Sequence, residues 1–183
     1  MKLVLVGTGY VGLVSGSCFA EFGYEVICVD KDEFRISELK KGKCPFFEPG
    51  IEELLSKHRD QTKLLSFTSS LTEAMEGADI IFITVGTPSK RLEGEADLSA
   101  VWNVAKDIAN NIKKYTLVVT KSTVPVGTTQ EIKKIISKIV PKENFDVVSN
   151  PEFLREGSAI NDFMRPDRII IGTDNEKSTK IMK

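Results

Sequence analysis

The sequence predicts an α/β fold in which helices cover both faces of a doubly wound, mostly parallel sheet. Three observations lead to this prediction. Short apolar segments recur along the 183 residues, with room for one helix between most neighbours. Most of these segments are continuous apolar runs, as expected of strands that are buried on both faces. The stretches between them carry apolar residues at helical spacing, and alternating strands and helices give a parallel sheet with right-handed crossovers.

Seven strands are expected, at residues 3–6, 25–29, 63–67, 80–85, 117–120, 146–149 and 168–171. The first helix is expected over residues 13–22. Gly23 suits the position after its end, because glycine readily adopts the left-handed conformation there. Residues 51–59 are helix-like, and His58 near their end, the one histidine of the chain, is expected at the surface rather than in a catalytic site.

Further helices are expected after the third strand. Residues 70–73 (SLTE) have the capping-box pattern that begins a short helix, and residues 128–131 (TTQE) form a second capping box. Residues 97–112 carry apolar side chains at helical spacing, and Trp102 on that stripe is expected in the core. The long irregular region is residues 41–49, which contains Pro45, Phe46, Phe47 and Pro49.

A glycine motif at residues 7–12 (GTGYVG) follows the first strand and precedes the first helix. In such a unit Gly7 allows a tight turn, Gly9 lets a pyrophosphate approach the backbone, and Gly12 lets the helix pack closely on the strand. The phosphates then lie at the helix N-terminus, where free N–H groups and the helix dipole favour anions. A glycine pattern alone is often an ordinary turn, but its place between strand and helix predicts a dinucleotide site.

Asp30 stands at the carboxyl end of the second strand, about 20 residues past the glycines. An acid at this place accepts hydrogen bonds from the 2′-hydroxyl of the adenosine ribose and repels a 2′-phosphate. NAD is therefore expected in preference to NADP. Lys31 and Arg35 qualify this expectation, because either side chain could meet a 2′-phosphate. Together with the glycine motif, Asp30 makes the predicted fold Rossmann-type.

The composition excludes several classes of protein. The formal net charge is −1 and the two signs are interleaved, so there is no basic stripe and we expect no nucleic-acid partner. No apolar stretch approaches the ~20 residues that span a bilayer, and the N-terminus begins a core strand, so we expect a cytoplasmic protein with no membrane partner. Cys18, Cys28 and Cys44 are too widely spaced for a zinc pattern, and no metal is expected. A reducing compartment suits them, and Cys18 and Cys28 are expected to be buried thiols.

Three loops at the carboxyl ends of strands carry the remaining candidates. They are residues 84–88 (TVGTP), 121–127 (KSTVPVG) and 150–157 (NPEFLREG). Because ligands of such sheets bind outside the carboxyl ends of the strands, the loops are expected to converge on one crevice. The alternative is that proline and glycine only punctuate these loops. Glu152 and Glu156 would share a face only in a helix, and Arg155 could pair with either in an ordinary surface turn.

Five stretches match a known pattern in its order: GTGYVGLVSGSCFAEFGYEVICVD at 7–30, KGKCPFFEPGIEELL at 41–55, VGTPS at 85–89, KSTVPVGTT at 121–129 and NPEFLREGSAINDF at 150–163. They resemble the N-terminal domain of the UDP-glucose/GDP-mannose dehydrogenase family, and NPEFLREG is the most specific of them. The resemblance implies an enzyme that oxidises the C6 alcohol of a nucleotide sugar to a carboxylate, using two NAD molecules in succession.

The resemblance also implies roles for individual residues. Glu152 would position or activate the water that hydrolyses a thioester intermediate, and Thr123 would help to hold that water. A carboxylate base suits this role when its surroundings tune its pKa. NAD would be bound by Gly7, Gly9, Tyr10, Val11, Gly12, Asp30, Arg35, Thr87, Thr123 and Glu156. The nucleotide sugar would be bound by Glu152, Phe153, Leu154, Arg155 and Glu156.

By the same resemblance, residues 1–183 would be one domain of a larger, homodimeric enzyme. The family forms its thioester on a cysteine of a later domain, and the cysteines of this chain match no such motif, so we expect a truncated chain that is inactive by itself. KSTVPVGTT favours UDP-glucose as the substrate, whereas VGTPSK at 85–90 also resembles the GDP-mannose dehydrogenases. A UDP-N-acetylhexosamine is a further alternative. A non-enzymatic NAD-sensing domain, which needs no catalytic carboxylate, is the alternative from another class.

Overall fold

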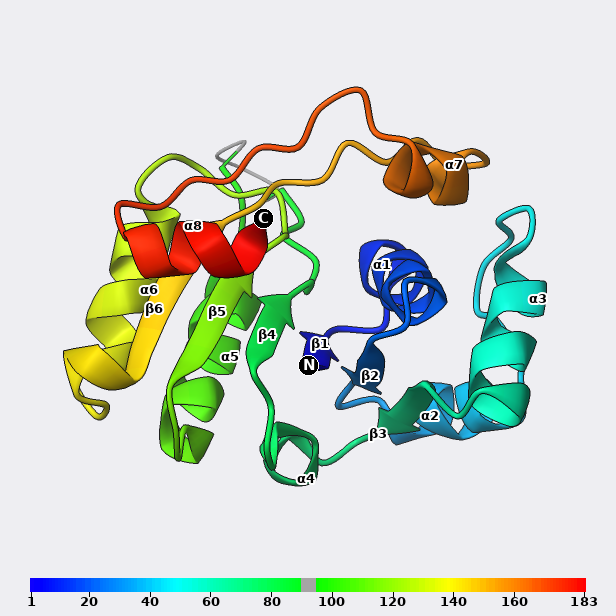
Figure 1. Ribbon diagram of the computed structural model, residues 1–183, viewed down its shortest axis with the longest axis horizontal. Helices are drawn as coiled ribbons and strands as arrows, with labels where there is room; N and C mark the ends of the chain where they lie inside the picture. Colours follow the sequence, from blue (N-terminus) through cyan, green and yellow to red (C-terminus); the bar gives the residue numbers. More distant parts are fainter. Residues whose placement is uncertain (90–94) are drawn as a thin grey trace.

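The computed structural model describes residues 1–89 and 95–183, so Lys90 of the VGTPSK stretch lies outside the described residues. Its centre is a six-stranded sheet with the order β3-β2-β1-β4-β5-β6, in which all neighbouring strands are parallel. The strands are β1 (Lys2–Val6), β2 (Glu25–Val29), β3 (Leu65–Thr68), β4 (Ile80–Ile83), β5 (Thr116–Thr120) and β6 (Phe145–Ser149). The predicted doubly wound, Rossmann-type α/β fold is confirmed (Figure 1).

Helices cover both faces of the sheet, because the strand order reverses direction after β3 and right-handed crossovers then place the later helices on the opposite face. One face carries α1 (Tyr10–Glu21), α2 (Glu33–Lys40), α3 (Ile51–Ser56) and α7 (Ala159–Met164). The other carries α4 (Leu71–Met75), α5 (Ser99–Asn111) and α6 (Thr128–Ile136). A last helix, α8 (Glu176–Met182), packs through Ile181 and Met182 on the α1 side (Figure 1).

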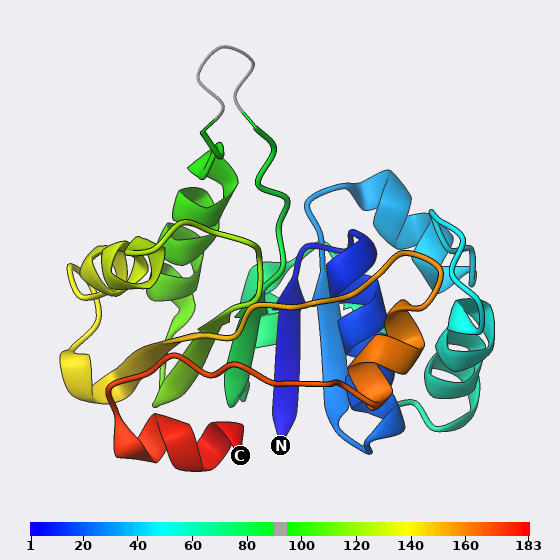
Figure 2. The ribbon, with the colours of Figure 1, turned by 90° about the horizontal axis from the view of Figure 1, so that it is seen from above.

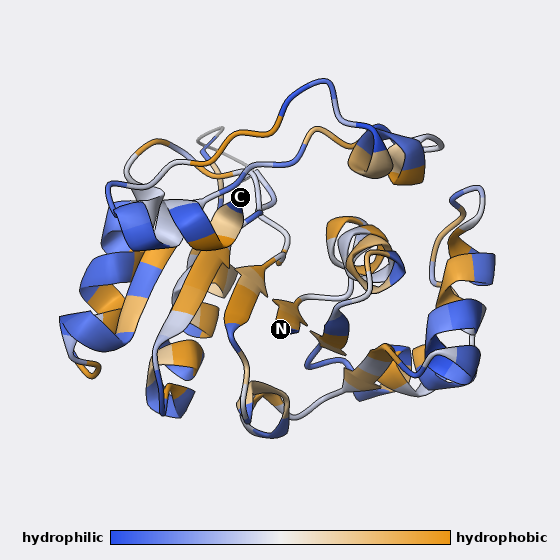
Figure 3. Cartoon of the chain, viewed as in Figure 1, coloured by the Kyte–Doolittle hydropathy of each residue, from blue (hydrophilic) through white to orange (hydrophobic). Residues whose placement is uncertain are grey.

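The core consists of two apolar layers, one on each face of the sheet. Leu3 and Leu5 of β1 point to the layer under α1, whereas Val4 points to the layer under α5. Most strand residues are apolar (Figure 3), although β6 also buries Asp146. Full burial of one such side chain stabilises the fold by about 1.5–3 kcal/mol. Trp102 of α5 is only partly buried but packs against the second layer.

Helix α1 lies very close to the sheet and ends as predicted. A Cβ atom at Gly16 would come within 2.7 Å of the Cys28 sulfur on β2, so only glycine permits this approach. Gly23 follows the helix with φ +91°, and its N–H donates to the Ala20 carbonyl oxygen at 2.9 Å. The left-handed glycine therefore ends the helix and turns the chain into β2.

The seventh predicted strand, at residues 168–171, is not formed. After β6 the chain crosses the carboxyl end of the sheet to α7. From α7 it runs back next to this crossing segment and leads to α8 (Figures 1 and 2). The returning run meets β6 only at an antiparallel bridge between Ser149 and Gly172, with N···O distances of 2.9 and 2.7 Å. Ile169 and Ile170 remain exposed, so the apolar run lies along the surface and adds no strand to the sheet.

The prediction of a surface position for His58 is wrong. The helical stretch continues past α3 as a π-helical turn, η1 (Lys57–Gln61), in which His58 is only 2% exposed. Its Nε2 atom lies 2.6 Å from a carboxylate oxygen of Glu21, and its Nδ1 atom lies 3.0 Å from the Thr62 hydroxyl. Because both ring nitrogens have partners, the imidazole can be buried at little cost.

One of the two predicted capping boxes is also wrong. Ser70 caps α4 as predicted, since its hydroxyl accepts a hydrogen bond from the Glu73 N–H at 3.3 Å. At α6, however, the N-cap is Gly127, and the hydroxyl of Thr128 donates to the Pro125 carbonyl oxygen at 2.7 Å instead. Within the described ranges, no helix is both long and apolar enough to cross a membrane.

Candidate functional site

The glycine motif joins β1 to α1 at the carboxyl end of the sheet. Gly7 has φ +109°, and a Cβ atom there would lie 2.8 Å from the Thr84 carbonyl oxygen. At Gly12 a Cβ atom would lie 1.9 Å from the Gly7 carbonyl oxygen, whereas at Gly9 it would meet nothing within 4 Å. Gly7 and Gly12 are therefore required by the turn and by close packing, and the space in front of Gly9 is open.

The open space faces the unpaired amides of α1. The N-cap is Gly9, which has no side chain to cap the helix, and the first intrahelical bond runs from the Leu13 N–H to the Gly9 carbonyl oxygen. The N–H groups of Tyr10, Val11 and Gly12 therefore have no partner inside the helix. Such amides, at the positive end of the helix dipole, are suited to bind a phosphate group.

Asp30 is fixed beside the glycine motif. Its Oδ2 atom accepts hydrogen bonds from the Thr8 N–H and the Thr8 hydroxyl, each at 2.8 Å, and its Oδ1 atom accepts one from the Asp32 N–H at 3.1 Å. The Arg35 guanidinium lies 3.4 Å from Oδ2. Burial alone would raise the pKa of Asp30, but these hydrogen bonds and the guanidinium outweigh it and lower the pKa below its usual value. The carboxylate is therefore ionised at neutral pH.

The loops after β4 and β5 are bonded to each other. The Thr87 hydroxyl donates to the Thr123 carbonyl oxygen at 2.8 Å, and the Ser122 hydroxyl donates to the Val85 carbonyl oxygen at 2.7 Å. The loop after β6 joins them at its start, where the Asn150 N–H donates to the Thr120 carbonyl oxygen at 2.9 Å. The three loops therefore leave the sheet side by side, with the hydroxyl-bearing side chain of Thr123 exposed.

The segment from Pro151 to Arg155 is not helical, so Glu152 and Glu156 do not lie on one helix face. A carboxylate oxygen of Glu152 accepts a hydrogen bond from the Leu154 N–H at 2.6 Å and holds a tight local turn. Arg155 pairs with neither glutamate. Its guanidinium forms two bonds to the Asp162 carboxylate, at 3.1 and 2.7 Å, and its own N–H donates to the same group at 2.9 Å.

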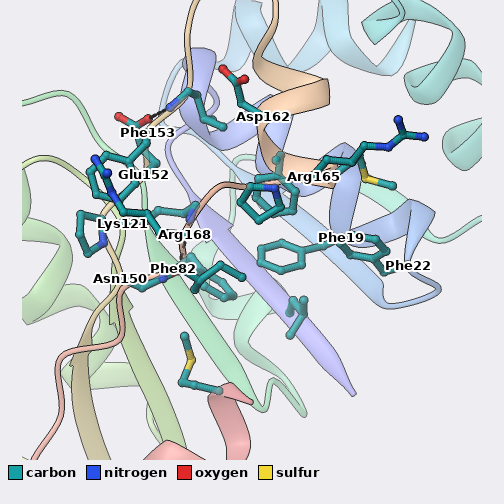
Figure 4. Close-up of a pocket in the computed structure, with 18 of the residues that line it drawn as sticks. Phe19, Phe22, Phe82, Lys121, Asn150, Glu152, Phe153, Asp162, Arg165 and Arg168 are labelled. Atoms are coloured by element: carbon teal, nitrogen blue, oxygen red, sulfur yellow. Dashed lines mark hydrogen bonds between the residues drawn. The ribbon is translucent and has the colours of Figure 1, made fainter.

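A cavity of about 700 Å³ opens beside Glu152 on the α1 side of the sheet (Figure 4). Aromatic and aliphatic side chains of β1, β4 and α1 form its floor, including Phe19 and Phe82. Glu152, Asn150 and Lys121 line one part of it, and the charged residues Asp162, Arg165 and Arg168 line it as well (Figure 4). The glycine motif and Asp30 do not line it, so this cavity is separate from the open space in front of Gly9.

Lys121 is a charged residue of this cavity to which the sequence assigned no role. It is 6% exposed, its Nζ atom donates to the Asn150 side-chain oxygen at 3.2 Å, and it lies 5.4 Å from the centre of the Phe163 ring. Burial lowers the pKa of Lys121 to about 8, although the nearby Glu152 carboxylate partly opposes the shift. Its place directly after β5 was the available signal, because polar residues at strand ends face the ligand side of such sheets.

Glu48 is a second residue that the sequence did not single out. It lies in the irregular stretch before α3 and is 3% exposed. Its carboxylate accepts hydrogen bonds from the Tyr10 hydroxyl, from the Gly157 N–H at 2.8 Å and from the Ile160 N–H at 3.4 Å. It therefore joins the first residue of α1 to the chain that follows Glu156.

The structure thus gathers the predicted residues into two groups. Gly7, Gly9 and Gly12 lie at the start of α1, and Asp30 is bonded to Thr8 of the same motif and lies 3.4 Å from Arg35. Thr87 and Thr123 are bonded in the neighbouring loops, whereas Phe153, Leu154 and Arg155 lie along the cavity with Glu152. Tyr10 connects the two groups, since its hydroxyl also receives a hydrogen bond from the Gly157 N–H at 3.2 Å.

The cysteines belong to the core rather than to a site. Cys18, Cys28 and Cys44 are free thiols, and the first two are fully buried as predicted. Burial raises the pKa of both Cys18 and Cys28 to about 12. Among residues 1–89 and 95–183, no group of three or more His, Cys, Asp or Glu side chains is arranged to hold a metal ion.

Comparison with known proteins agrees with this geometry. The model of the UDP-glucose/GDP-mannose dehydrogenase family, NAD binding domain, matches residues 1–183. The chain is 56% identical to a UDP-glucose 6-dehydrogenase of Rhizobium meliloti over 95% of its own length and 40% of the relative's. It is 48% identical to a UDP-glucose 6-dehydrogenase of Bacillus subtilis, covering all of this chain and 39% of the other.

Solved structures give the same result. A UDP-glucose dehydrogenase of Pyrobaculum islandicum superposes with a TM-score of 0.93 at 39% identity, over 99% of this chain and 42% of the other. A ternary complex of the GDP-mannose dehydrogenase of Pseudomonas aeruginosa superposes with a TM-score of 0.94 at 38% identity, over 100% and 43%. The chain thus spans about two fifths of the length of these relatives. It belongs to the UDP-glucose/GDP-mannose dehydrogenase family, and it is the NAD-binding domain of that family.

Proposed function

We propose that this domain serves a nucleotide-sugar 6-dehydrogenase that oxidises UDP-glucose to UDP-glucuronate. Oxidation of a CH2OH group to a carboxylate removes four electrons, and NAD supplies this chemistry when bound by accepting a hydride in each of two rounds. The observation that carries the coenzyme part of the proposal is the joint placement of the open α1 amides and the ionised Asp30, held by Thr8 at 2.8 Å. UDP-glucose is favoured over GDP-mannose because UDP-glucose 6-dehydrogenases match at 56% and 48% identity.

Asp30 and Arg35 support NAD rather than NADP. Oδ1 of Asp30 accepts one hydrogen bond among the described residues, from Asp32, and a carboxylate oxygen has room for a second, from a ribose hydroxyl. The Arg35 guanidinium lies against the carboxylates of Asp30 and Asp32, at 3.4 and 4.0 Å, which offsets the positive charge that a 2′-phosphate would need. Both features favour a 2′-hydroxyl.

The coenzyme proposal can be tested on the 183-residue chain by calorimetric titration with NAD and, separately, with NADP. We expect NAD to bind at least about tenfold more tightly. Asp30→Asn should weaken NAD binding by about 10- to 100-fold, which corresponds to the loss of a hydrogen bond to a charged group. It should also reduce the preference for NAD over NADP. Glu33→Gln, an exposed carboxylate-to-amide change three residues away, is the control. Equal affinity for NAD and NADP in the unmodified chain would contradict the proposal.

Catalysis is proposed to depend on Glu152 and Thr123. Glu152 would hold or activate the water that attacks the thioester, Thr123 would hold that water, and the segment 152–156 would contact the nucleotide sugar. The support is that Glu152 lines the cavity beside Lys121 (Figure 4). The thioester cysteine and the remaining catalytic groups would come from residues outside this domain, in a homodimeric cytoplasmic enzyme.

The catalytic part needs a dehydrogenase that contains residues 1–183. There Glu152→Gln should lower kcat by about 100-fold or more, the range of general acid–base catalysis, and should change the Kd for NAD by less than about twofold. Formation of two NADH per UDP-glucose is expected, with GDP-mannose and UDP-N-acetylmannosamine as comparison substrates. Unchanged kcat in the Glu152→Gln protein would show that Glu152 does not act in the mechanism. If the enzyme turned over GDP-mannose but not UDP-glucose, the proposed substrate would be wrong.

A further inference from the structure

We propose that Glu48 is a positioning residue that transmits the binding of the dinucleotide from the glycine motif to the loop carrying Glu152 and Glu156. The inference rests on the proposed function, because it requires NAD at the glycine motif. Two parts of the chain that are far from Glu48 in the sequence meet at its buried carboxyl group: residue 10 at the start of α1, and the short stretch from residue 157 to residue 160 that leads into α7.

The contacts of Glu48 make it a rigid junction. Glu48 is 3% exposed, and its carboxyl group accepts hydrogen bonds but forms no ion pair among the described residues. One oxygen, Oε2, accepts from both the Tyr10 hydroxyl and the Gly157 N–H, and Oε1 accepts from the Ile160 N–H. Loss of any donor would leave a buried polar group less well satisfied, which is costly. The N-terminus of α1 and the stretch from residue 157 to residue 160 are therefore held together through Glu48.

Tyr10 is the link to the coenzyme. It is the first residue of α1, and its N–H is one of the amides that face the open space in front of Gly9. Its side-chain hydroxyl lies on the side of Glu48, where it also bonds to the backbone at residues 155 and 157. Burial, together with the hydrogen bond to Glu48, raises the pKa of Tyr10 to about 12, so the hydroxyl remains a donor throughout the physiological range.

The loop side of the junction is equally direct. Gly157 follows Glu156 without an intervening residue, has φ +84°, and donates its N–H to both Glu48 and Tyr10. A shift of the α1 N-terminus on phosphate binding therefore moves, or stiffens, the residue beside Glu156. By reciprocity, a nucleotide sugar that orders residues 152–156 would raise the affinity for NAD by the same factor.

Hydrogen exchange of the 183-residue chain, with and without saturating NAD, tests this coupling. The Gly157 and Ile160 amides donate to Glu48, so their exchange rates report on the junction itself. In the unmodified chain we expect NAD to slow exchange in the glycine motif and also at residues 157 and 160, there by about fivefold or more. Tyr10→Phe removes the link while leaving both amide donors to the buried carboxylate, so it should fold.

In Glu48→Gln, and in Tyr10→Phe at an NAD concentration that titration shows to saturate that variant, NAD should still slow exchange in the glycine motif, but should change exchange at residues 157 and 160 by less than about twofold. Glu52→Gln, an exposed change on α3, is the matched control and should behave as the unmodified chain. A residue that only stabilises the fold would speed exchange with and without NAD alike, so an unchanged NAD effect at 157 and 160 in Tyr10→Phe overturns the inference.

The unmodified chain separates this inference from the proposed function. Slowed exchange at the glycine motif, without any effect of NAD at residues 157 and 160, overturns the coupling alone. No effect of NAD at any amide overturns the proposed function and the coupling together.

Discussion

At the scale of single residues, the candidate site depends on charges held out of water. Asp30, Glu48 and Lys121 are each largely buried, and each is stabilised in a different way. Asp30 has hydrogen-bond donors and a guanidinium, Glu48 has donors only, and Lys121 has one side-chain acceptor and the field of Glu152. Lys121 is the least well compensated, because an ammonium can donate three hydrogen bonds.

Because of Lys121, the free energy of unfolding should change with pH in the alkaline range. Its pKa is about 8 in the folded chain, against 10.5 ordinarily, so the unfolded chain binds more protons between these values. Stability should rise with pH across that window, and the full penalty should be present below about pH 8. Lys121→Met should increase the free energy of unfolding at pH 7 by on the order of 1–3 kcal/mol, because it removes the buried ammonium. The loss of the hydrogen bond to Asn150 reduces this gain.

Urea unfolding at pH 7 and at pH 10 measures this effect. The gain from Lys121→Met should shrink at the higher pH, where the folded protein already carries a neutral lysine. Lys114→Met is a control, because Lys114 is exposed and pairs with Asp79 at 2.6 Å at the opposite end of the sheet. A Lys121→Met gain that is the same at both pH values would contradict the lowered pKa.

At the scale of elements, α1 carries both the packing and the binding surface of the domain. The three glycines of its N-terminal motif were predicted from sequence because their roles are local, and the contacts of Gly7 and Gly12 agree with them. Glu48 and His58 were not, because a polar residue is buried only when distant partners satisfy it. Glu48 meets groups 38 and 109 residues away, and His58 meets Glu21 37 residues away. The strand predicted at 168–171 was wrong for the same reason, because a strand forms only where it can pair along its length with a neighbouring strand.

Two alanine substitutions in the glycine motif should separate stability from binding. Gly12→Ala would place its methyl 1.9 Å from the Gly7 carbonyl oxygen, a backbone atom that cannot move easily, and should destabilise the fold by on the order of 3 kcal/mol. Gly9→Ala meets nothing within 4 Å and should leave the melting temperature almost unchanged. It should nevertheless weaken NAD binding at least about tenfold, because the methyl occupies the space of the pyrophosphate.

These outcomes can be measured by thermal melting and by NAD titration of the same two proteins. A Gly9→Ala protein that melts as early as Gly12→Ala would contradict the assignment of open space in front of Gly9.

His58 joins the π-helical turn to the far end of α1. His58→Ala should lower the free energy of unfolding by about 3 kcal/mol, because it opens a cavity and removes a partner of Glu21. Affinity for NAD should not change, since a 12-residue helix places this end about 18 Å from the glycine motif. Lys57→Ala, which removes the exposed ion pair with Glu21, should cost less than about 1 kcal/mol. Chemical denaturation of both proteins decides whether the buried ring or the surface pair holds the turn.

At the scale of the whole molecule, two apolar layers enclose a parallel sheet whose polar loops gather at its carboxyl ends. The alternation of strands and helices was enough to predict this architecture, because it depends on periodicity along the whole chain. The junction at Glu48 and the cavity under residues 150–168 depend on how the last third of the chain folds back, which periodicity does not record. The sequence therefore predicted the frame and the turn at the glycine motif better than the region around the cavity.

Reactivity of the thiols reports on the integrity of that whole fold. Cys18 and Cys28 are fully buried with pKa values of about 12, whereas Cys44 is half-buried. A thiol reagent at pH 8 should therefore modify one cysteine before the other two in the native chain, and all three in denaturant. Mass spectrometry should place the early modification on Cys44. Early modification of Cys28 would show that α1 separates from β2 in solution.

The shared direction of the six strands has a practical consequence for handling the protein. Every loop that contacts a proposed ligand leaves a carboxyl end, whereas the turn η2 (Lys142–Asn144) precedes β6 and lies at the opposite side. A short tag inserted into that exposed turn would allow the domain to be immobilised on a sensor surface with its coenzyme pocket facing the buffer.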